Sequence, residues 1–219
     1  DFFEKVGRGG RLSDPDRTVS VSRALLAADD LRKVLRSDPD APQELKDLLP
    51  QVDQILQVGS LALGAKSQES DGKFREELDQ PVGPEGPRMI DTVMALRAMT
   101  RAWNRSEMGA IGFRIHEGWM WLDRFWKQES MHAARSLVRS RNTARSDELR
   151  TYRASELWEW LQLWRESQKV RQKIAGGYAP AIPWDTWDAR MKDLEEELRG
   201  HLQTGVTDRK STRLNSSHV

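Results

Sequence analysis

Arginine is concentrated in one stretch of the chain, residues 132–153. This stretch holds six arginines against two acidic residues, Asp147 and Glu148, which leaves an excess of four positive charges. Four of the arginines gather at a predicted helix end and the polar turn after it: Arg135, Arg139, Arg141 and Arg145. Guanidinium groups bind phosphates through paired hydrogen bonds, so this stretch is a candidate nucleic-acid surface. The alternative is a solvated surface between two helices, and only Tyr152 is available there for base stacking.

Tryptophan is the second unusual feature, with nine in the chain. Six of them form two groups along the sequence: Trp119, Trp121 and Trp126, then Trp158, Trp160 and Trp164. At about 100° per residue, each group places one ring off the helix face that the other two share. These two residues are Trp121 and Trp158. We expect them to pack together across their helices as core, and the alternative is an exposed aromatic platform for a protein partner.

One segment carries glycine and lysine at suggestive spacing. Residues 59–67 read GSLALGAKS. They resemble the phosphate-binding loop of P-loop nucleotidases, with Ala65 inserted before Lys66. That loop places its second glycine beside the lysine, follows a strand and opens a helix. Here a helical pattern precedes the segment and a polar stretch follows it, so the sequence favours a helix end over a nucleotide site.

Histidine, serine and carboxylate patterns provide no catalytic set. His116 and Glu117 lack the second histidine of a zinc-protease helix, and no serine lies in a nucleophile-elbow pattern. We expect His116 to lie at the core edge as a hydrogen-bonded neutral imidazole rather than as a metal ligand. Acidic runs such as residues 195–197 are typical of polar helix faces. The sequence therefore predicts no catalytic residue, no metal site and no cofactor.

Composition narrows the class of protein. The chain has 219 residues and no cysteine. It is long enough for one domain or two small ones, and disulfides, thiolate zinc sites, iron–sulfur clusters and cysteine nucleophiles are excluded. No apolar run approaches the roughly 20 residues of a membrane-spanning helix, and residues 1–20 lack the pattern of a secretory signal. We therefore expect an intracellular protein, of the cytoplasm, without membrane contact. Because the formal net charge is only +1, any attraction to nucleic acid would have to come from local clustering of charge.

Hydrophobic spacing is helical almost throughout, which predicts an all-α fold. The strongest pattern steps by four, four, three and four residues through Ile111, Ile115, Trp119, Leu122 and Trp126. No segment alternates apolar and polar residues as a strand would. Six helices are predicted, over residues 21–35, 45–63, 89–103, 108–139, 147–175 and 184–202.

The predicted helices fall into two parts. Residues 38–42 read DPDAP and separate the first two helices, because each proline disfavours helix in the residue before it. The sequence thus predicts a helical hairpin over residues 20–66. Residues 67–87 are rich in proline and glycine and form the predicted linker. A tryptophan-rich helical bundle is predicted over residues 88–203.

Neither end of the chain is expected to contribute to function. Residues 1–19 are predicted to be an irregular segment of a longer protein, because the chain begins at Asp1 with no methionine. Residues 208–219, DRKSTRLNSSHV, resemble the translation of a sequencing adapter that recurs at the ends of assembled reading frames. The resemblance covers this tail alone and implies that the tail is artefactual. Its polar composition also predicts disorder.

These features favour a non-enzymatic helical module for assembly or protein interaction. Such a module binds a protein partner or a second copy of itself, and Trp121 and Trp158 are the candidate partner-binding residues. A nucleic-acid-binding or packaging protein that uses the arginine-rich helix end is the first alternative. A non-catalytic segment of a larger enzyme is the second.

Overall fold

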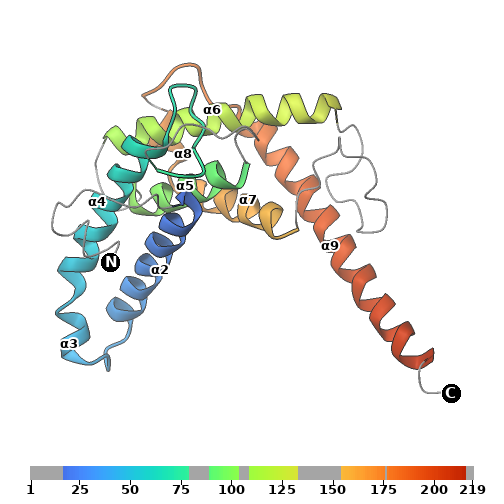
Figure 1. Cartoon of the computed structure of the whole chain (residues 1–219), viewed down its shortest axis with the longest axis horizontal. Helices are drawn as coiled ribbons and strands as arrows, with labels where there is room; N and C mark the ends of the chain where they lie inside the picture. Colours follow the sequence, from blue (N-terminus) through green and yellow to red (C-terminus); the bar gives the residue numbers. More distant parts are fainter. Residues whose placement is uncertain (1–16, 79–88, 104–108, 133–153, 176, 216–219) are drawn as a thin grey trace.

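The computed structural model describes residues 17–78, 89–103, 109–132, 154–175 and 177–215 (Figure 1). Over these residues the chain is mainly helical and forms two isolated β-bridges but no strand. The all-α prediction is therefore confirmed. The helices are α2 (Thr18–Ser37), α3 (Gln43–Lys46), α4 (Leu49–Ser67), α5 (Met89–Trp103), α6 (Gly109–His132), α7 (Ala154–Ser167), α8 (Arg171–Ala175) and α9 (Trp184–Asn215).

Helix α5 is the centre of the fold. It packs against α2, α4, α6 and α7. Residues 91–100 of α5 are all buried, as expected for a helix with neighbours around its whole circumference. In Figure 1 the arm made by α2, α3 and α4 descends on one side, α9 descends on the other, and α5 to α8 join the two.

Helices α2 and α4 form the predicted hairpin. Helix α2 ends at Ser37 because Pro39 disfavours helix in the residue before it. Pro50 lies in the first turn of α4, where a backbone N–H would have no partner within the helix. The sequence predicts one helix over residues 45–63, whereas the structure divides it at residues 47–48, just before this proline.

The first part of the predicted linker is packed against the core. Residues 68–78 turn tightly at Gly72, which has a φ of +93°. An added Cβ at Gly72 would lie 2.1 Å from the carbonyl oxygen of Glu117, so only glycine fits. Phe74 is fully buried, and its backbone N–H donates to Thr92 Oγ1 at 3.0 Å. The buried side chain of Phe74 therefore anchors this polar segment to the core. Residues 79–87 of the predicted linker lie outside the described residues.

One continuous set of buried side chains extends from Val21 of α2 to Leu198 of α9. The base of the hairpin and the tryptophan-rich helices therefore share a core, and their division into two units stays a prediction. The strongest predicted pattern is confirmed on α6. Its first four members, Ile111, Ile115, Trp119 and Leu122, are buried, and Trp126 is half-buried against the same core.

The later helices differ from their predicted bounds. The sequence predicts one helix up to the Gly176–Gly177 pair, whereas the structure ends α7 at Ser167 and places a turn before α8. Helix α9 continues to Asn215 rather than stopping near Leu202, because no proline follows Pro183. Residues 208–215, predicted to be disordered, are thus helical. None of the helices in the described residues is long and apolar enough to cross a membrane.

Candidate functional site

The four arginines predicted to contact nucleic acid, Arg135, Arg139, Arg141 and Arg145, lie outside the described residues. Nucleic-acid binding by this stretch stays a prediction. The segment that resembles a phosphate-binding loop is described, and it forms the last turns of α4. Its backbone is helical up to Ser67, and Gly59 and Gly64 are buried within the helix. The predicted helix end is confirmed.

Five tryptophans from three helices pack together near the C-terminal end of the fold, and we call them the tryptophan cluster. The ring centroids of Trp119 and Trp187 are 5.1 Å apart, and those of Trp160 and Trp187 are 5.5 Å apart. Edge-to-face pairs at such distances contribute roughly 0.5–1.5 kcal/mol beyond area burial. The members are Trp119 and Trp126 of α6, Trp160 of α7, and Trp184 and Trp187 of α9.

Two arginines lie over rings of the tryptophan cluster. The guanidinium carbon of Arg190 lies 4.8 Å from the centroid of Trp187, and that of Arg171 lies 4.6 Å from the centroid of Trp184. Arg171 also pairs with Asp188. Aromatic surfaces of this kind can bind a cationic ligand. Here the chain supplies the cations itself, so the arrangement is a closed structural core.

The carboxyl of Asp188, beside these rings, has a lowered pKa because it pairs with Arg171. Hydrogen bonds from Arg171 lower the pKa of its carboxyl to about 2, against the opposing effect of burial, and the indole N–H of Trp164 donates a further hydrogen bond at 2.7 Å. Asp188 is therefore ionised at every physiological pH. Its charge fixes Arg171 over the ring of Trp184.

Trp121 and Trp158, the candidate partner-binding residues, are in different surroundings. Trp121 is buried, and its ring stacks on Phe125 of the same helix with centroids 4.9 Å apart. Trp158 is 49% exposed, and Arg165 lies 5.7 Å from its ring centroid. The prediction that both are buried as one packed pair is wrong for Trp158, because its side of α7 faces outward. Of the two, only Trp158 is accessible to a partner.

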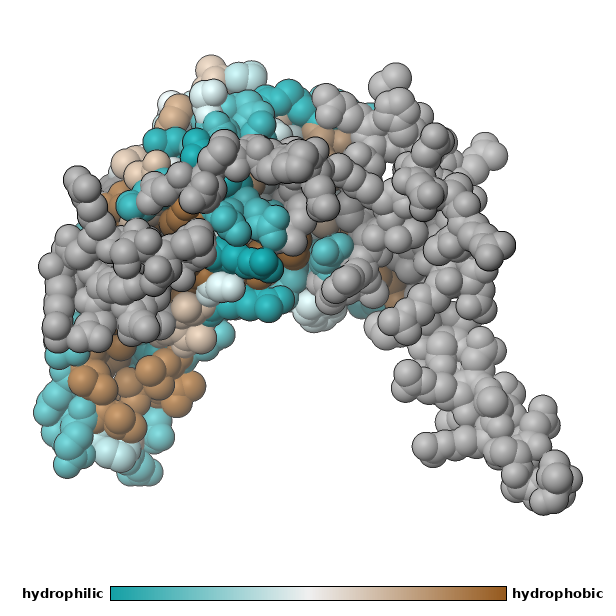
Figure 2. Space-filling model, in the orientation of Figure 1, coloured by the Kyte–Doolittle hydropathy of each residue, from teal (hydrophilic) through white to brown (hydrophobic). Residues whose placement is uncertain are grey.

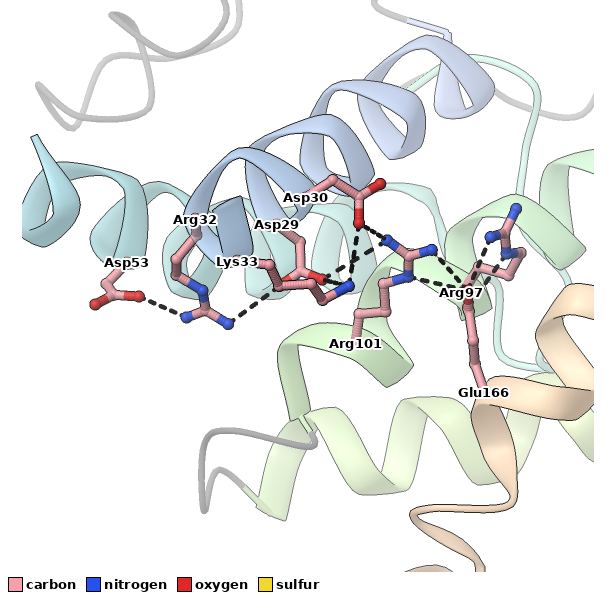
Figure 3. A network of polar contacts seen from close by, with 8 residues as sticks. All are labelled: Asp29, Asp30, Arg32, Lys33, Asp53, Arg97, Arg101 and Glu166. Atoms are coloured by element: carbon pink, nitrogen blue, oxygen red, sulfur yellow. Dashed lines mark hydrogen bonds and ion pairs between the residues drawn. The ribbon is translucent and has the colours of Figure 1, made fainter. Parts of the chain in front are cut away.

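A network of ion pairs connects the hairpin to the rest of the fold (Figure 3). Arg101 of α5 is its central residue. Its guanidinium donates to Asp30 of α2 at 2.7 Å and to Glu166 of α7 at 2.8 Å. Arg97 donates to the same Glu166 oxygen at 2.8 Å. The network joins α2, α4, α5 and α7, and its members are Asp29, Asp30, Arg32, Lys33, Asp53, Arg97, Arg101 and Glu166.

The charges of the ion-pair network cancel, since four carboxylates face four basic groups. Asp29, Arg32 and Arg97 are buried. Burial opposes the ionisation of Asp30, but hydrogen bonds and charges from Lys33 and Arg101 hold the pKa of its carboxyl below the usual value. A network with no surplus charge has little attraction for a cation or an anion. Its role is to hold four helices in one arrangement.

His116 is a buried link between α6 and the loop before α9. Its Nε2 lies 2.8 Å from the carbonyl oxygen of Pro180, and its Nδ1 lies 3.1 Å from Glu117 Oε1. Both partners are acceptor oxygens and a neutral imidazole has a single N–H to donate, so one of these two contacts is its hydrogen bond, and the predicted hydrogen-bonded histidine is confirmed. Within the described part of the chain, no three His, Asp or Glu side chains are grouped so that they could hold a metal ion.

The far part of the hairpin carries an exposed apolar surface, which we call the hairpin face. Figure 2 shows apolar side chains gathered on the arm formed by α2, α3 and α4. Leu31 and Val34 are one turn apart on α2, and Leu45 and Leu48 are one turn apart at α3. The four side chains of the hairpin face are 48%, 57%, 43% and 41% exposed in that order.

The hairpin face results from the position of α5. Helix α5 packs against the side of α2 that carries Leu25 and Asp29, near the base of the arm. Leu31 and Val34 are rotated away from that side by the 100° step of the helix. The predicted helix over residues 21–35 contains both Leu25 and Leu31, and the spacing of apolar residues does not show which of them a neighbouring helix covers.

No protein-family model matches this chain, and neither the curated proteins nor the solved structures include one that is significantly similar to it.

Proposed function

We propose that this protein is a helical protein-interaction module and that the hairpin face is its binding surface. The observation that supports the proposal is that four large aliphatic side chains, each more than two-fifths exposed, belong to the arm formed by α2, α3 and α4, where Figure 2 shows apolar surface. Contiguous apolar surface of this kind is typical of protein-binding sites, whereas apolar residues scattered singly are not. The hairpin face contains no catalytic groups.

The attachment of the hairpin also supports binding. The ion-pair network fixes α2 to α5 and α7 through Arg101, and Arg32 joins α2 to Asp53 of α4. The arm is therefore held in one orientation before a partner arrives. A binding surface that is already ordered avoids part of the entropy cost of association.

A selection experiment tests this function. A phage-displayed library of helical peptides would be selected on the wild-type protein and counter-selected on a quadruple variant with Leu31→Ser, Val34→Ser, Leu45→Ser and Leu48→Ser. We expect enriched peptides with apolar residues at three- and four-residue spacing, because such peptides lay one face along a helical groove. Their affinity, measured by isothermal titration calorimetry, should fall at least about tenfold for the variant, which is roughly 1.4 kcal/mol.

A matched control uses the exposed aromatic residues elsewhere. The double variant Phe113→Ser and Trp158→Ser removes two apolar side chains of similar exposure that lie outside the hairpin face. Retained binding by this variant supports the hairpin face. Loss of binding in this double variant but not in the quadruple variant would move the site to the exposed aromatic residues of α6 and α7. A library that yields no hairpin-dependent binder would contradict the proposed function.

A further inference from the structure

Four acidic residues lie in the turn of the hairpin and along α3, next in the chain to residues of the hairpin face. Their side chains are all exposed, and between residues 37 and 48 the only basic residue is Lys46, which leaves three net negative charges. Asp38 follows Val34 by one helical turn, and the others are next to the apolar residues of α3 or in the turn before it. The four residues, which we call the acidic rim, are Asp38, Asp40, Glu44 and Asp47.

The basic groups near the tip have partners of their own. Lys46 Nζ donates to the carbonyl oxygen of Pro39 at 2.7 Å, and Arg36 pairs with Asp53 at 2.7 Å. Lys33 pairs with Asp29 at 2.8 Å, farther along α2. Arg36 and Lys33 are thus paired with carboxylates outside the acidic rim, whereas Lys46 keeps its charge beside the rim and is already counted in the three net negative charges.

The carboxylates of the acidic rim make only neutral contacts. Asp38 Oδ1 accepts the backbone N–H of Asp40 at 2.9 Å, and Asp47 Oδ1 accepts the side-chain amide of Gln43 at 2.8 Å. Within the described residues, none of the four carboxylates of the acidic rim is paired with a basic side chain. The hairpin face is thus an apolar surface with negative charge along its outer edge.

We propose that the hairpin face binds a basic amphipathic helix, with apolar side chains against the face and lysines or arginines opposite the acidic rim. This inference rests on the proposed function and specifies the partner. A helix fits because an amphipathic helix lays one apolar face along an exposed apolar surface and keeps its polar face in solvent. Complementary charges at the rim select the partner and speed its association.

A second copy of this chain is a poorer occupant. In a symmetric contact both copies present the same patch. Pairing tip to tip would bring two acidic rims together, and like charges at an interface are unfavourable. The rim therefore favours a partner of opposite charge over self-association.

Three designed peptides test the charge of the partner. The first is a helix of roughly 18 residues with a leucine stripe flanked by lysines, and the second has the same stripe flanked by glutamates. The third is a scramble of the first, with the same composition and no stripe. Binding to the full chain is measured by fluorescence anisotropy in low and high salt. We expect the lysine peptide to bind on the order of tenfold tighter than the glutamate peptide in low salt, with a smaller ratio in high salt.

Two triple variants, each of which loses three negative charges, show whether the acidic rim causes the preference for the lysine peptide. The rim variant carries Asp38→Asn, Glu44→Gln and Asp47→Asn. The control variant carries Asp185→Asn, Asp193→Asn and Glu196→Gln, which neutralises three exposed carboxylates on α9. We expect the preference for lysine to disappear in the rim variant and to persist in the control, with both variants folded by circular dichroism.

Several outcomes would overturn the inference. Equal binding of the lysine and glutamate peptides would leave the proposed function intact but show that the partner is not basic. Equal loss of the preference in both variants would show that net charge, not the acidic rim, attracts the peptide. Binding of the scramble as tightly as the striped peptide would exclude helical docking. A dimer in sedimentation that the lysine peptide cannot dissociate would assign the face to a second copy.

Discussion

The hairpin and the tryptophan cluster are both made of apolar residues at helical spacing, but their side chains have very different surroundings. In the cluster, Trp119 of α6 is enclosed by rings from α9, and arginines lie over rings of the cluster. In the hairpin, Leu31 and Val34 are about half exposed. The number of neighbouring helices, more than the spacing of apolar residues, decides whether a stripe becomes a core.

The largest effect should come from opening the tryptophan cluster. Trp119→Ala should lower the free energy of unfolding by about 3–5 kcal/mol, because it leaves a cavity among rings that cannot collapse into it. Chemical denaturation followed by circular dichroism measures this loss. Trp158→Ala is the matched control and should cost less than about 1 kcal/mol, since its ring is half exposed. A similar loss for both residues would contradict the contrast between core and surface.

Removal of one basic group from the ion-pair network should have the next largest effect. Arg97→Ala leaves Glu159 and Glu166 without their shared partner, and the loss should be about 3 kcal/mol because the guanidinium is buried. Arg165→Ala removes an exposed ion pair to Glu195 and should cost under about 1 kcal/mol. Urea titrations of both variants test whether burial makes this difference.

The pH dependence of stability should show a smaller contribution from Asp188. The folded protein lowers the pKa of this carboxyl from 3.8 to about 2, so the stabilisation is complete above about pH 4 and is lost as the pH falls toward 2. Asp188→Asn should be less stable than the wild type at pH 7, and the difference should shrink between pH 4 and pH 2. If the difference is unchanged over that range, the folded protein does not lower the pKa of Asp188.

The smallest change in stability should occur at the hairpin face. Leu45→Ser and Leu48→Ser should each alter the free energy of unfolding by no more than about 0.5 kcal/mol, because neither side chain leaves the core. Thermal unfolding of the single variants would provide the measurement. A loss comparable to that of Trp119→Ala would show that the two leucines are packed within the folded protein and would remove the basis for a binding surface.

Much of the fold could be predicted from the sequence because its signals are local. The proline pair at residues 39 and 42 marks the turn of the hairpin, and the stripe on α6 identifies Trp119 as core. The stacking of Trp121 on Phe125 was also visible in principle, since the two residues are four apart on one helix. The expected pairing of Trp121 with Trp158 required the relative rotation of two helices, which spacing does not specify.

The hairpin face and the ion-pair network could not be found in the same way. Periodicity shows that Leu31 belongs to an apolar face, but whether another helix covers that face depends on the path of distant segments. Arg97 and Glu166 are 69 positions apart, and no short-range pattern links them. Both features arise from tertiary arrangement.

The neutrality of the ion-pair network limits how this protein can change over evolution. A substitution that removes Glu166 alone would leave Arg97 paired only with Glu159 and Arg101 only with carboxylates of α2, so the network would carry one surplus positive charge in a partly buried position. Substitution of one arginine alone would leave the carboxylate underpaired. Related chains should therefore change positions 97, 101 and 166 together. Such chains either keep all three charged residues or replace all three with apolar residues.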